Sequence, residues 1–221
     1  MAEAILARQV VKSFGQVHAL QGLDFDLHPG ECFGLLGPSG AGKSTMVGLV
    51  CCISPIDAGQ LKVLGMDTQS HCRRIRSRLG LVPQHDNLDP SLSVLDNLVF
   101  YGGYFGMPRS QAKTRAEELL HFVALDDRAT EPIDHLSAAL RKRLLIARGL
   151  INSPDLLILD EPTTGLDPQA RQHIWQRLRQ LKKAGTTMLL CTHSTDESKQ
   201  LCDRLAILNS GRLLPEGMPS A

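Results

Sequence analysis

The stretch Gly37-Pro38-Ser39-Gly40-Ala41-Gly42-Lys43-Ser44 decides the fold, because it fills every position of the pattern G-x-x-x-x-G-K-S/T. An apolar run at 32–36 precedes it and predicts a buried strand. Apolar residues with helical spacing follow it: Met46, Val47, Leu49, Val50 and Ile53. Glycine-rich turns between a strand and a helix are common, but Lys and Ser in this context favour a loop that binds nucleoside triphosphate.

The residue types of this loop suit phosphate binding. Glycines let the backbone curl until its N–H groups face an anion, and the helix that begins near Lys43 adds its positive end. Lys43 is expected to reach the β- and γ-phosphates, and the Ser44 hydroxyl is expected to ligate Mg²⁺. The candidate residues for binding the nucleoside triphosphate are Gly37, Pro38, Ser39, Gly40, Ala41, Gly42, Lys43, Ser44 and the adjacent Thr45.

Composition limits the classes of protein. The chain of 221 residues has a formal net charge of +1, which gives no bias toward nucleic acid, so we expect no nucleic-acid partner. We expect a single domain over residues 1–221. Its start, Met1-Ala2-Glu3-Ala4, lacks a basic-then-apolar signal, and no apolar run approaches the ~20 residues of a membrane span. A cytosolic chain is therefore predicted, and any membrane role needs a partner.

Apolar runs alternate with helical patterns along most of the sequence, which predicts an α/β fold with a mainly parallel sheet. Strands are expected at 5–11, 23–27, 32–36, 61–64, 79–82, 156–159, 188–191 and 205–208. Helices are expected at about 168–184 and 196–202. The pattern is helical from about residue 90 to residue 152, which indicates a helical subdomain.

The apolar run 156–159 ends in a pair of carboxylates, Asp160 and Glu161. A carboxylate at the end of a buried strand beside the phosphate loop can hold Mg²⁺, so Asp160 is predicted as a metal residue. Glu161 stands where a general base could polarise the water that attacks the γ-phosphate. Alone, an acidic pair would more simply end a strand; its combination with the phosphate loop favours a catalytic role.

The segment Asp160-Glu161-Pro162-Thr163-Thr164-Gly165-Leu166-Asp167 resembles the Walker B and D-loop block of ATP-binding-cassette (ABC) transporter ATPases. The resemblance extends from about residue 5 to residue 211. It implies a P-loop NTPase core with a mainly parallel sheet, an N-terminal antiparallel β subdomain and a helical subdomain. It also implies ATP and Mg²⁺ as cofactors.

Further site residues follow from this resemblance. Gln84 matches the Q-loop glutamine, which in the family contacts Mg²⁺ or water and faces the membrane partner. His193 matches the switch histidine, a sensor of the γ-phosphate. Phe14 is the candidate for stacking on adenine, although a core or turn role is the alternative.

One segment departs from the family pattern. Where the family has a signature near LSGGQ that caps ATP held by the opposite subunit, this chain has Leu136-Ser137-Ala138-Ala139-Leu140. Ser137 can still donate its hydroxyl to that phosphate. Glycine permits close backbone approach and φ values that alanine resists, so Ala138 and Ala139 are expected to weaken subunit closure and hydrolysis. The basic run 141–143 is interpreted as a solvated helix face.

Within the family, the segments 82–89, 97–107 and 165–171 resemble the ATP-binding subunits of nodulation-factor exporters. The resemblance implies a peripheral subunit on the cytoplasmic face of the inner membrane, bound to an integral-membrane permease and paired with a second ATP-binding subunit. The pair is a homodimer or a heterodimer, and the cargo is a lipo-chitooligosaccharide. The alternatives are a non-hydrolysing half of a heterodimer, the ATPase of a related polysaccharide or drug exporter, or a soluble cassette ATPase.

Overall fold

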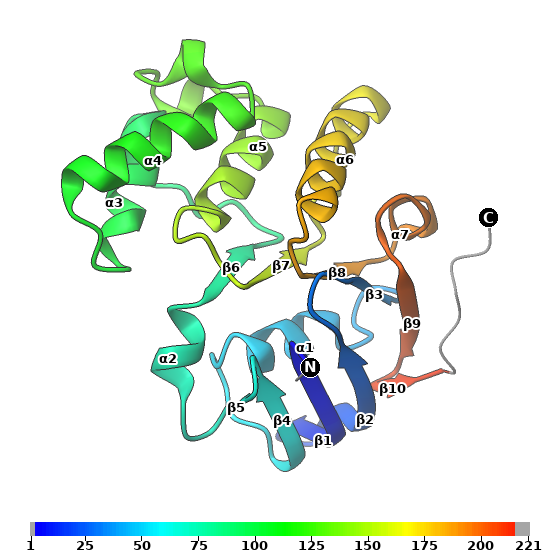
Figure 1. Ribbon diagram of the computed structural model, residues 1–221. Coiled ribbons are helices and arrows are strands. Elements are labelled where there is room, and N and C mark those ends of the chain that lie inside the picture. The colour runs from blue at the N-terminus through cyan, green and yellow to red at the C-terminus, as the bar shows by residue number, and fades with distance from the viewer. Residues whose placement is uncertain (1–2, 215–221) are drawn as a thin grey trace.

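A six-stranded sheet forms the centre of the computed structural model, which describes residues 3–214 (Figure 1). Its strand order is β10-β9-β3-β8-β7-β6. The strands are β3 (Cys32–Leu36), β6 (Leu79–Val82), β7 (Leu156–Asp160), β8 (Met188–Thr192), β9 (Arg204–Asn209) and β10 (Arg212–Leu213). Neighbours pair in parallel except β9 and β10, which are antiparallel. The mainly parallel α/β core expected from the apolar runs is confirmed.

A second sheet of four antiparallel strands, in the order β2-β1-β4-β5, covers the N-terminal part. Its strands are β1 (Ile5–Phe14), β2 (Val17–Leu27), β4 (Ala58–Val63) and β5 (Met66–Asp67). The first two are longer than expected from the apolar residues alone. A tight turn at Gly15, with φ 60°, lets the pairing continue to Phe14 and Val17. Backbone hydrogen bonding therefore extends these strands through polar residues.

The helices lie in three places. Helices α1 (Lys43–Val50) and α2 (Cys72–Arg76) connect the sheets, and α6 (Pro168–Lys183) and α7 (Thr195–Leu201) flank the parallel sheet. Helices α3 (Val94–Gly103), α4 (Arg109–Phe122) and α5 (Ala138–Gly149) pack on one another as a separate group, with 3₁₀ turns at Asp126–Arg128 and Ile133–His135 (Figure 1). Within residues 3–214, none of these helices combines the length and apolar character needed to cross a bilayer.

Two apolar clusters hold these layers together. The first joins the antiparallel sheet to α1 and one face of the parallel sheet, with Phe25 stacked on Phe33 at 5.4 Å between ring centroids. The second joins the α3–α5 group to the other face and to α6 through fully buried residues such as Leu144, Leu157 and Leu178. Burial on both faces explains why the parallel strands have uninterrupted apolar sequences.

One apolar residue expected on the first helix lies outside it. Helix α1 ends at Val50, Cys52 has φ 54°, and Ile53 is 70% exposed. The left-handed residue at position 52 turns the chain away from the helix axis, so the helical spacing that included Ile53 was wrong at that position.

Parallel pairing places the ends of three strands at one edge of the sheet. Leu36 of β3 pairs with Thr192 of β8, and Asp160 of β7 pairs with Cys191. The backbone N–H of Gly37 donates to the carbonyl of Thr192 at 3.1 Å. The phosphate loop, the acidic pair and His193 therefore meet at the carboxyl edge, where open α/β sheets bind ligands.

Candidate nucleotide-binding site

The loop between β3 and α1 approaches its neighbours so closely that two glycines are required. A Cβ on Gly37 would lie 2.2 Å from the carbonyl oxygen of Leu208. Gly42 has φ 111°, and a Cβ there would lie 2.7 Å from the carbonyl oxygen of Ala19. The sequence pattern is therefore enforced by packing of the loop against β2 and β9 as well as by its expected ligand.

Lys43 is the first residue of α1, directly after this loop, and its side chain is only 6% exposed. Its Nζ donates to the carbonyls of Gly37 at 2.7 Å and Pro38 at 3.1 Å. The same Nζ lies 3.2 Å from Oε1 of Glu161. The ammonium group is thus held at the loop by oxygen acceptors, where it can bind an incoming phosphate.

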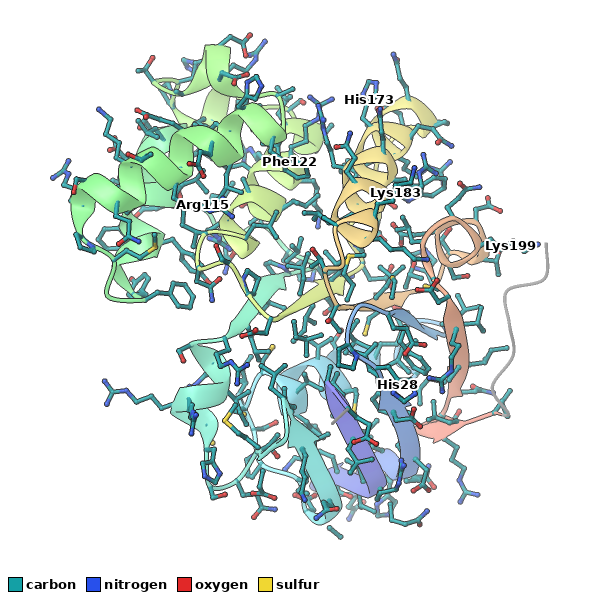
Figure 2. All side chains as sticks on the ribbon, in the orientation of Figure 1. His28, Arg115, Phe122, His173, Lys183 and Lys199 are labelled. Carbon is teal, nitrogen blue, oxygen red and sulfur yellow. The ribbon has the colours of Figure 1, made fainter. Side chains whose placement is uncertain are left out.

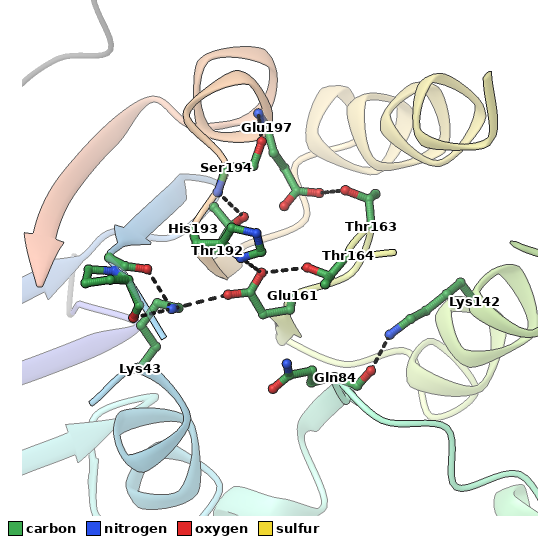
Figure 3. Close-up of polar contacts among 12 residues, drawn as sticks. Lys43, Gln84, Lys142, Glu161, Thr163, Thr164, Thr192, His193, Ser194 and Glu197 are labelled. Carbon is green, nitrogen blue, oxygen red and sulfur yellow. Dashed lines mark hydrogen bonds and ion pairs between the residues drawn. The ribbon is translucent and has the colours of Figure 1, made fainter. Parts of the chain in front are cut away.

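Glu161 receives partners from three segments (Figure 3). Its Oε1 faces Lys43, while its Oε2 accepts from the Thr164 hydroxyl at 2.8 Å and lies 2.8 Å from Nδ1 of His193. The residue has φ 51°, an uncommon conformation for a side chain other than glycine, at the turn after β7. The structure therefore joins Lys43, Glu161 and His193, which lie far apart in the sequence.

Asp160 fits a magnesium ion. Its residue is 7% exposed, and its Oδ1 is buried without a hydrogen-bond partner. Burial raises the pKa of this carboxyl, against the opposing effect of a hydrogen bond from Ser44. A buried carboxylate oxygen without a partner, beside a serine hydroxyl, matches the oxygen ligands that Mg²⁺ prefers.

A cavity of about 530 Å³ opens beside these residues, and its size suits a nucleotide. Its lining comprises Phe14, Val17, His18, Ala19, Gln21, Ser39, Gly40, Gly42, Lys43, Ser44, Thr45, Gln84, Glu161, Ser210 and Gly211. Phe14 is 54% exposed, and Nζ of Lys12 lies 5.3 Å from its ring centroid. Its ring is therefore a wall of the cavity, outside the core.

Ser137 does not line this cavity; it lies at the N-terminus of α5, where its Oγ accepts from the backbone N–H of Leu140 at 3.4 Å. Ala138 and Ala139 form the first turn of α5 and have negative φ; Ala138 is exposed and Ala139 is half-buried. The expectation that these positions need a φ disfavoured by alanine was wrong, because an α-helical turn suits alanine. Only the added methyl groups distinguish them from glycine here.

The basic run 141–143 is half-buried, so its interpretation as a solvated face was also wrong. Lys142 Nζ donates to the carbonyl of Gln84 at 2.6 Å (Figure 3). It also donates to the carbonyl of Pro83 at 3.3 Å. Arg141 contacts Asp86 at 3.3 Å, and Arg143 contacts His173 at 3.1 Å. Helix α5 therefore holds the backbone of Gln84 in place.

Sequence reasoning missed Lys142, Thr164 and Glu197 as contributors to the site. Thr164 was within the quoted motif, three residues after Glu161, and that spacing was the available signal. No local sequence pattern predicted that Lys142 and Glu197 contact the site, because their contacts depend on how α5 and α7 pack on the loops.

Comparisons with known proteins identify the family of the chain. A family model described as ABC transporter matches residues 20–164. Nod factor export ATP-binding protein I of Paraburkholderia xenovorans (strain LB400) is 47% identical over 99% of this chain and 72% of that protein. The protein of the same name in Ralstonia nicotianae (strain ATCC BAA-1114 / GMI1000) is 47% identical over 94% of this chain and 65% of that protein.

Two solved structures share the fold. A dimeric post-hydrolysis state of the ATP-binding cassette MJ0796, bound to ADP and Pi, has a TM-score of 0.88 at 27% identity and covers 98% of this chain and 99% of that chain. CbiO1 from Clostridium perfringens, part of the ABC transporter complex cbiONQ, has a TM-score of 0.89 at 26% identity, covering 99% and 90%. With its phosphate loop and carboxylates at one sheet edge, the chain therefore belongs to the ABC transporter family, as an ATP-binding domain and an ATPase.

Proposed function

We propose that this chain powers an ABC exporter by hydrolysing ATP and that the cargo is a nodulation-factor-like lipo-oligosaccharide. The contact of Glu161 with both Lys43 and His193 carries the hydrolytic part of the proposal. The printed names of relatives at 47% identity support the cargo. Residues 1–221 act as one ATP-binding domain, and residues 90–152 are its helical subdomain.

Lys43 and the N–H groups of its loop bind the β- and γ-phosphates of ATP. Ser44 and Asp160 hold Mg²⁺, with Gln84 beside them. A Mg²⁺ ion held there would supply positive charge that stabilises the phosphates during transfer. When Lys43 engages phosphate, Glu161 becomes free to accept a proton from the attacking water, and His193 responds to the γ-phosphate.

The subunit works as a pair on a membrane permease. Each phosphate loop meets the segment 136–140 of the opposite subunit, at the cytoplasmic face of the inner membrane. The dimeric cassette and the transporter-complex membership of the two structural neighbours support this assembly. The pair is a homodimer or a heterodimer.

Ala138 and Ala139 lower the hydrolytic rate by obstructing the capping contact. Their methyl groups belong to the first turn of α5, where Ala138 is exposed and Ala139 is half-buried, and where backbone N–H groups must approach phosphate closely. The alternative in the extreme case is a subunit that binds ATP without turnover and acts as the regulatory half of a heterodimer. The ATPase of a related polysaccharide or drug exporter is the alternative for the cargo.

Steady-state Mg-ATP hydrolysis tests the proposal, with the parent chain, the double reversion Ala138→Gly/Ala139→Gly, and Glu161→Gln, which is expected to lose turnover. Faster turnover in the reverted chain alone supports obstruction by the methyl groups. Equal and measurable turnover in both chains overturns obstruction by the methyl groups. Nucleotide binding with no measurable turnover in either chain supports the regulatory half. The cargo is tested in vesicles with the co-purified permease, by comparing ATP-dependent transport of a lipo-chitooligosaccharide with that of a polysaccharide.

A further inference from the structure

Glu197 is a buried carboxylate next to the site but outside its cavity. It lies on α7, four residues after His193, and is 1% exposed. Its Oε1 accepts from the Thr163 hydroxyl at 2.6 Å (Figure 3). The same oxygen accepts from Nε1 of Trp175 at 3.1 Å. The carboxylate therefore joins three segments: the loop after β7, helix α6 and helix α7.

The local sequence predicts a different role for this residue. Ser194 and Glu197 have the S-x-x-E spacing of a capping box, in which the glutamate accepts from the serine backbone N–H. Instead, the N–H of Ser194 donates to Oγ1 of Thr192 at 3.0 Å. The cap of α7 is complete without the Glu197 carboxylate, because Ser194 Oγ accepts the N–H of Glu197 at 3.2 Å.

The two segments that Glu197 connects also carry the residues that contact Glu161. Thr163 precedes Thr164, whose hydroxyl donates to Glu161, and α7 begins directly after the loop that carries His193. Without the hydrogen bond that the Thr163 hydroxyl donates to Glu197, the side-chain hydrogen bonds between these two segments would, within residues 3–214, be those of Glu161 itself. A buried carboxylate is costly unless hydrogen bonds compensate it, and here the Thr163 hydroxyl and the Trp175 indole N–H do so.

We propose that Glu197 is a positioning residue for ATP hydrolysis: by bonding Thr163, it holds the loop after β7 against α7 and fixes Glu161 between Thr164 and His193. The inference rests on the proposed role of Glu161 as general base. Glu197 touches neither Glu161 nor the cavity, so it acts on orientation and not on nucleotide affinity. Misplacement of a general base by about 1 Å can cost roughly 10²-fold in rate.

The single tryptophan of the chain reports this arrangement directly. Trp175 is 4% exposed and donates to the same oxygen as Thr163. When Lys43 transfers from Glu161 to phosphate, the contacts of Glu161 rearrange, and the change reaches Trp175 through Thr163 and Glu197. We therefore expect Mg-ATP to alter the intrinsic fluorescence of the protein.

The experiment compares Glu197→Ala, Glu197→Gln and Thr163→Val with Asp203→Ala as the matched control. Asp203 also connects α6 to the end of α7, through Lys182 at 2.7 Å, but at the end remote from His193. Turnover, KM, ATP affinity and the free energy of unfolding are measured for each. All variants are made in the parent and in the Ala138→Gly/Ala139→Gly chain, whose turnover is expected to be higher.

Glu197→Ala should lower kcat by roughly 10²-fold, and Thr163→Val should lower it by roughly 10-fold. KM and ATP affinity should stay near the parent values in both variants. Glu197→Gln should recover most of kcat, because its amide oxygen can accept from both donors. Asp203→Ala should keep the parent kcat. The fluorescence response to Mg-ATP should persist in Glu197→Gln and disappear in Thr163→Val.

Parent-like kcat in both Glu197→Ala and Thr163→Val would overturn the inference, and so would an equal loss in Asp203→Ala. If Glu197→Ala does not fold, Thr163→Val decides, since it removes one hydroxyl at nearly constant volume. Glu161→Gln separates the two proposals. If Glu161→Gln keeps the parent turnover, both the general-base role of Glu161 and the positioning role of Glu197 are wrong. If Glu161→Gln loses turnover while Thr163→Val keeps the parent kcat, only the positioning role is wrong.

Discussion

Lys43 and Glu161 form an ion pair with both side chains almost fully buried: Nζ lies 3.2 Å from Oε1, and the side chains are 6% and 5% exposed. The pair joins the phosphate loop to the end of β7. It places Lys43, the proposed phosphate-binding residue, against Glu161, the proposed general base. The ammonium group of Lys43 therefore pairs with Glu161 when nucleotide is absent and with phosphate when nucleotide is bound. Entry of phosphate must therefore compete with Glu161 for Lys43.

Lys43→Met should abolish ATP binding and also destabilise the chain. Removing one member of a buried ion pair leaves an uncompensated charge, with a cost of about 3 kcal/mol. The double variant Lys43→Met/Glu161→Gln should recover part of this loss, because the orphaned charge is gone. Urea denaturation without nucleotide measures the free energy of unfolding of the single and double variants. Strictly additive losses would contradict a coupled pair.

Asp160→Asn should stabilise the Mg²⁺-free protein at neutral pH and lower Mg²⁺-dependent turnover by roughly 10²-fold. Burial raises the pKa of this carboxyl in the folded state, so the folded chain binds the proton more tightly than the unfolded chain. Its contribution therefore favours folding at low pH and is lost as pH rises through the interval between the unfolded and folded pKa values.

Unfolding of the parent and of Asp160→Asn as a function of pH, with EDTA present, checks this sign. The asparagine variant should lack the decline above the ordinary aspartate pKa. Greater stability of the parent at neutral pH would argue against an uncompensated carboxylate at this position.

Lys142→Met should lower turnover by roughly 10-fold through loss of the bonds to the carbonyls of Gln84 and Pro83. Hydrogen bonds from charged donors contribute about 1.5–3 kcal/mol each. Arg143→Met is the control, since Arg143 contacts His173 on α6 and not the Gln84 segment. Hydrolysis and proteolytic protection of residues 83–87 are the measurements. Equal behaviour of the two variants would remove the role of Lys142.

Phe14→Ala should weaken ATP affinity by about 1–3 kcal/mol, the range for stacking of a base on an aromatic ring. Because the ring is 54% exposed, the free energy of unfolding should change little. Phe14→Tyr should retain affinity. Phe100→Ala, at a ring 58% exposed on α3, controls for loss of a surface aromatic. Fluorescence titration of ATP in competition with GTP measures whether Phe14 contacts the base of the nucleotide.

Ala138→Gly/Ala139→Gly should reduce the free energy of unfolding even if it raises turnover. Both positions are in the first turn of α5, and glycine costs roughly 0.5–1 kcal/mol relative to alanine at each helical position. Thermal unfolding of the two chains measures the difference. A reverted chain with unchanged stability would indicate that this turn is already frayed in the parent.

The sequence predicted the sheet strands well where the chain is buried on both faces. The runs at 32–36 and 79–82 match β3 and β6, because a strand with no solvent face must be apolar throughout. Predictions failed at Ile53 and in the run 141–143. A left-handed residue ended α1, and the packing of α5 on the Gln84 segment buried charged side chains; neither event leaves a local pattern.

The sequence by itself determined the phosphate loop, the acidic pair and the order of the motifs, because each depends on residue types at short, fixed spacing. Only the tertiary structure decided which groups meet: Glu161 with Lys43 and His193, Lys142 with Gln84, and Glu197 with Thr163. These contacts join residues 32 to 118 positions apart, where strand order and helix packing, and not local periodicity, set the distance.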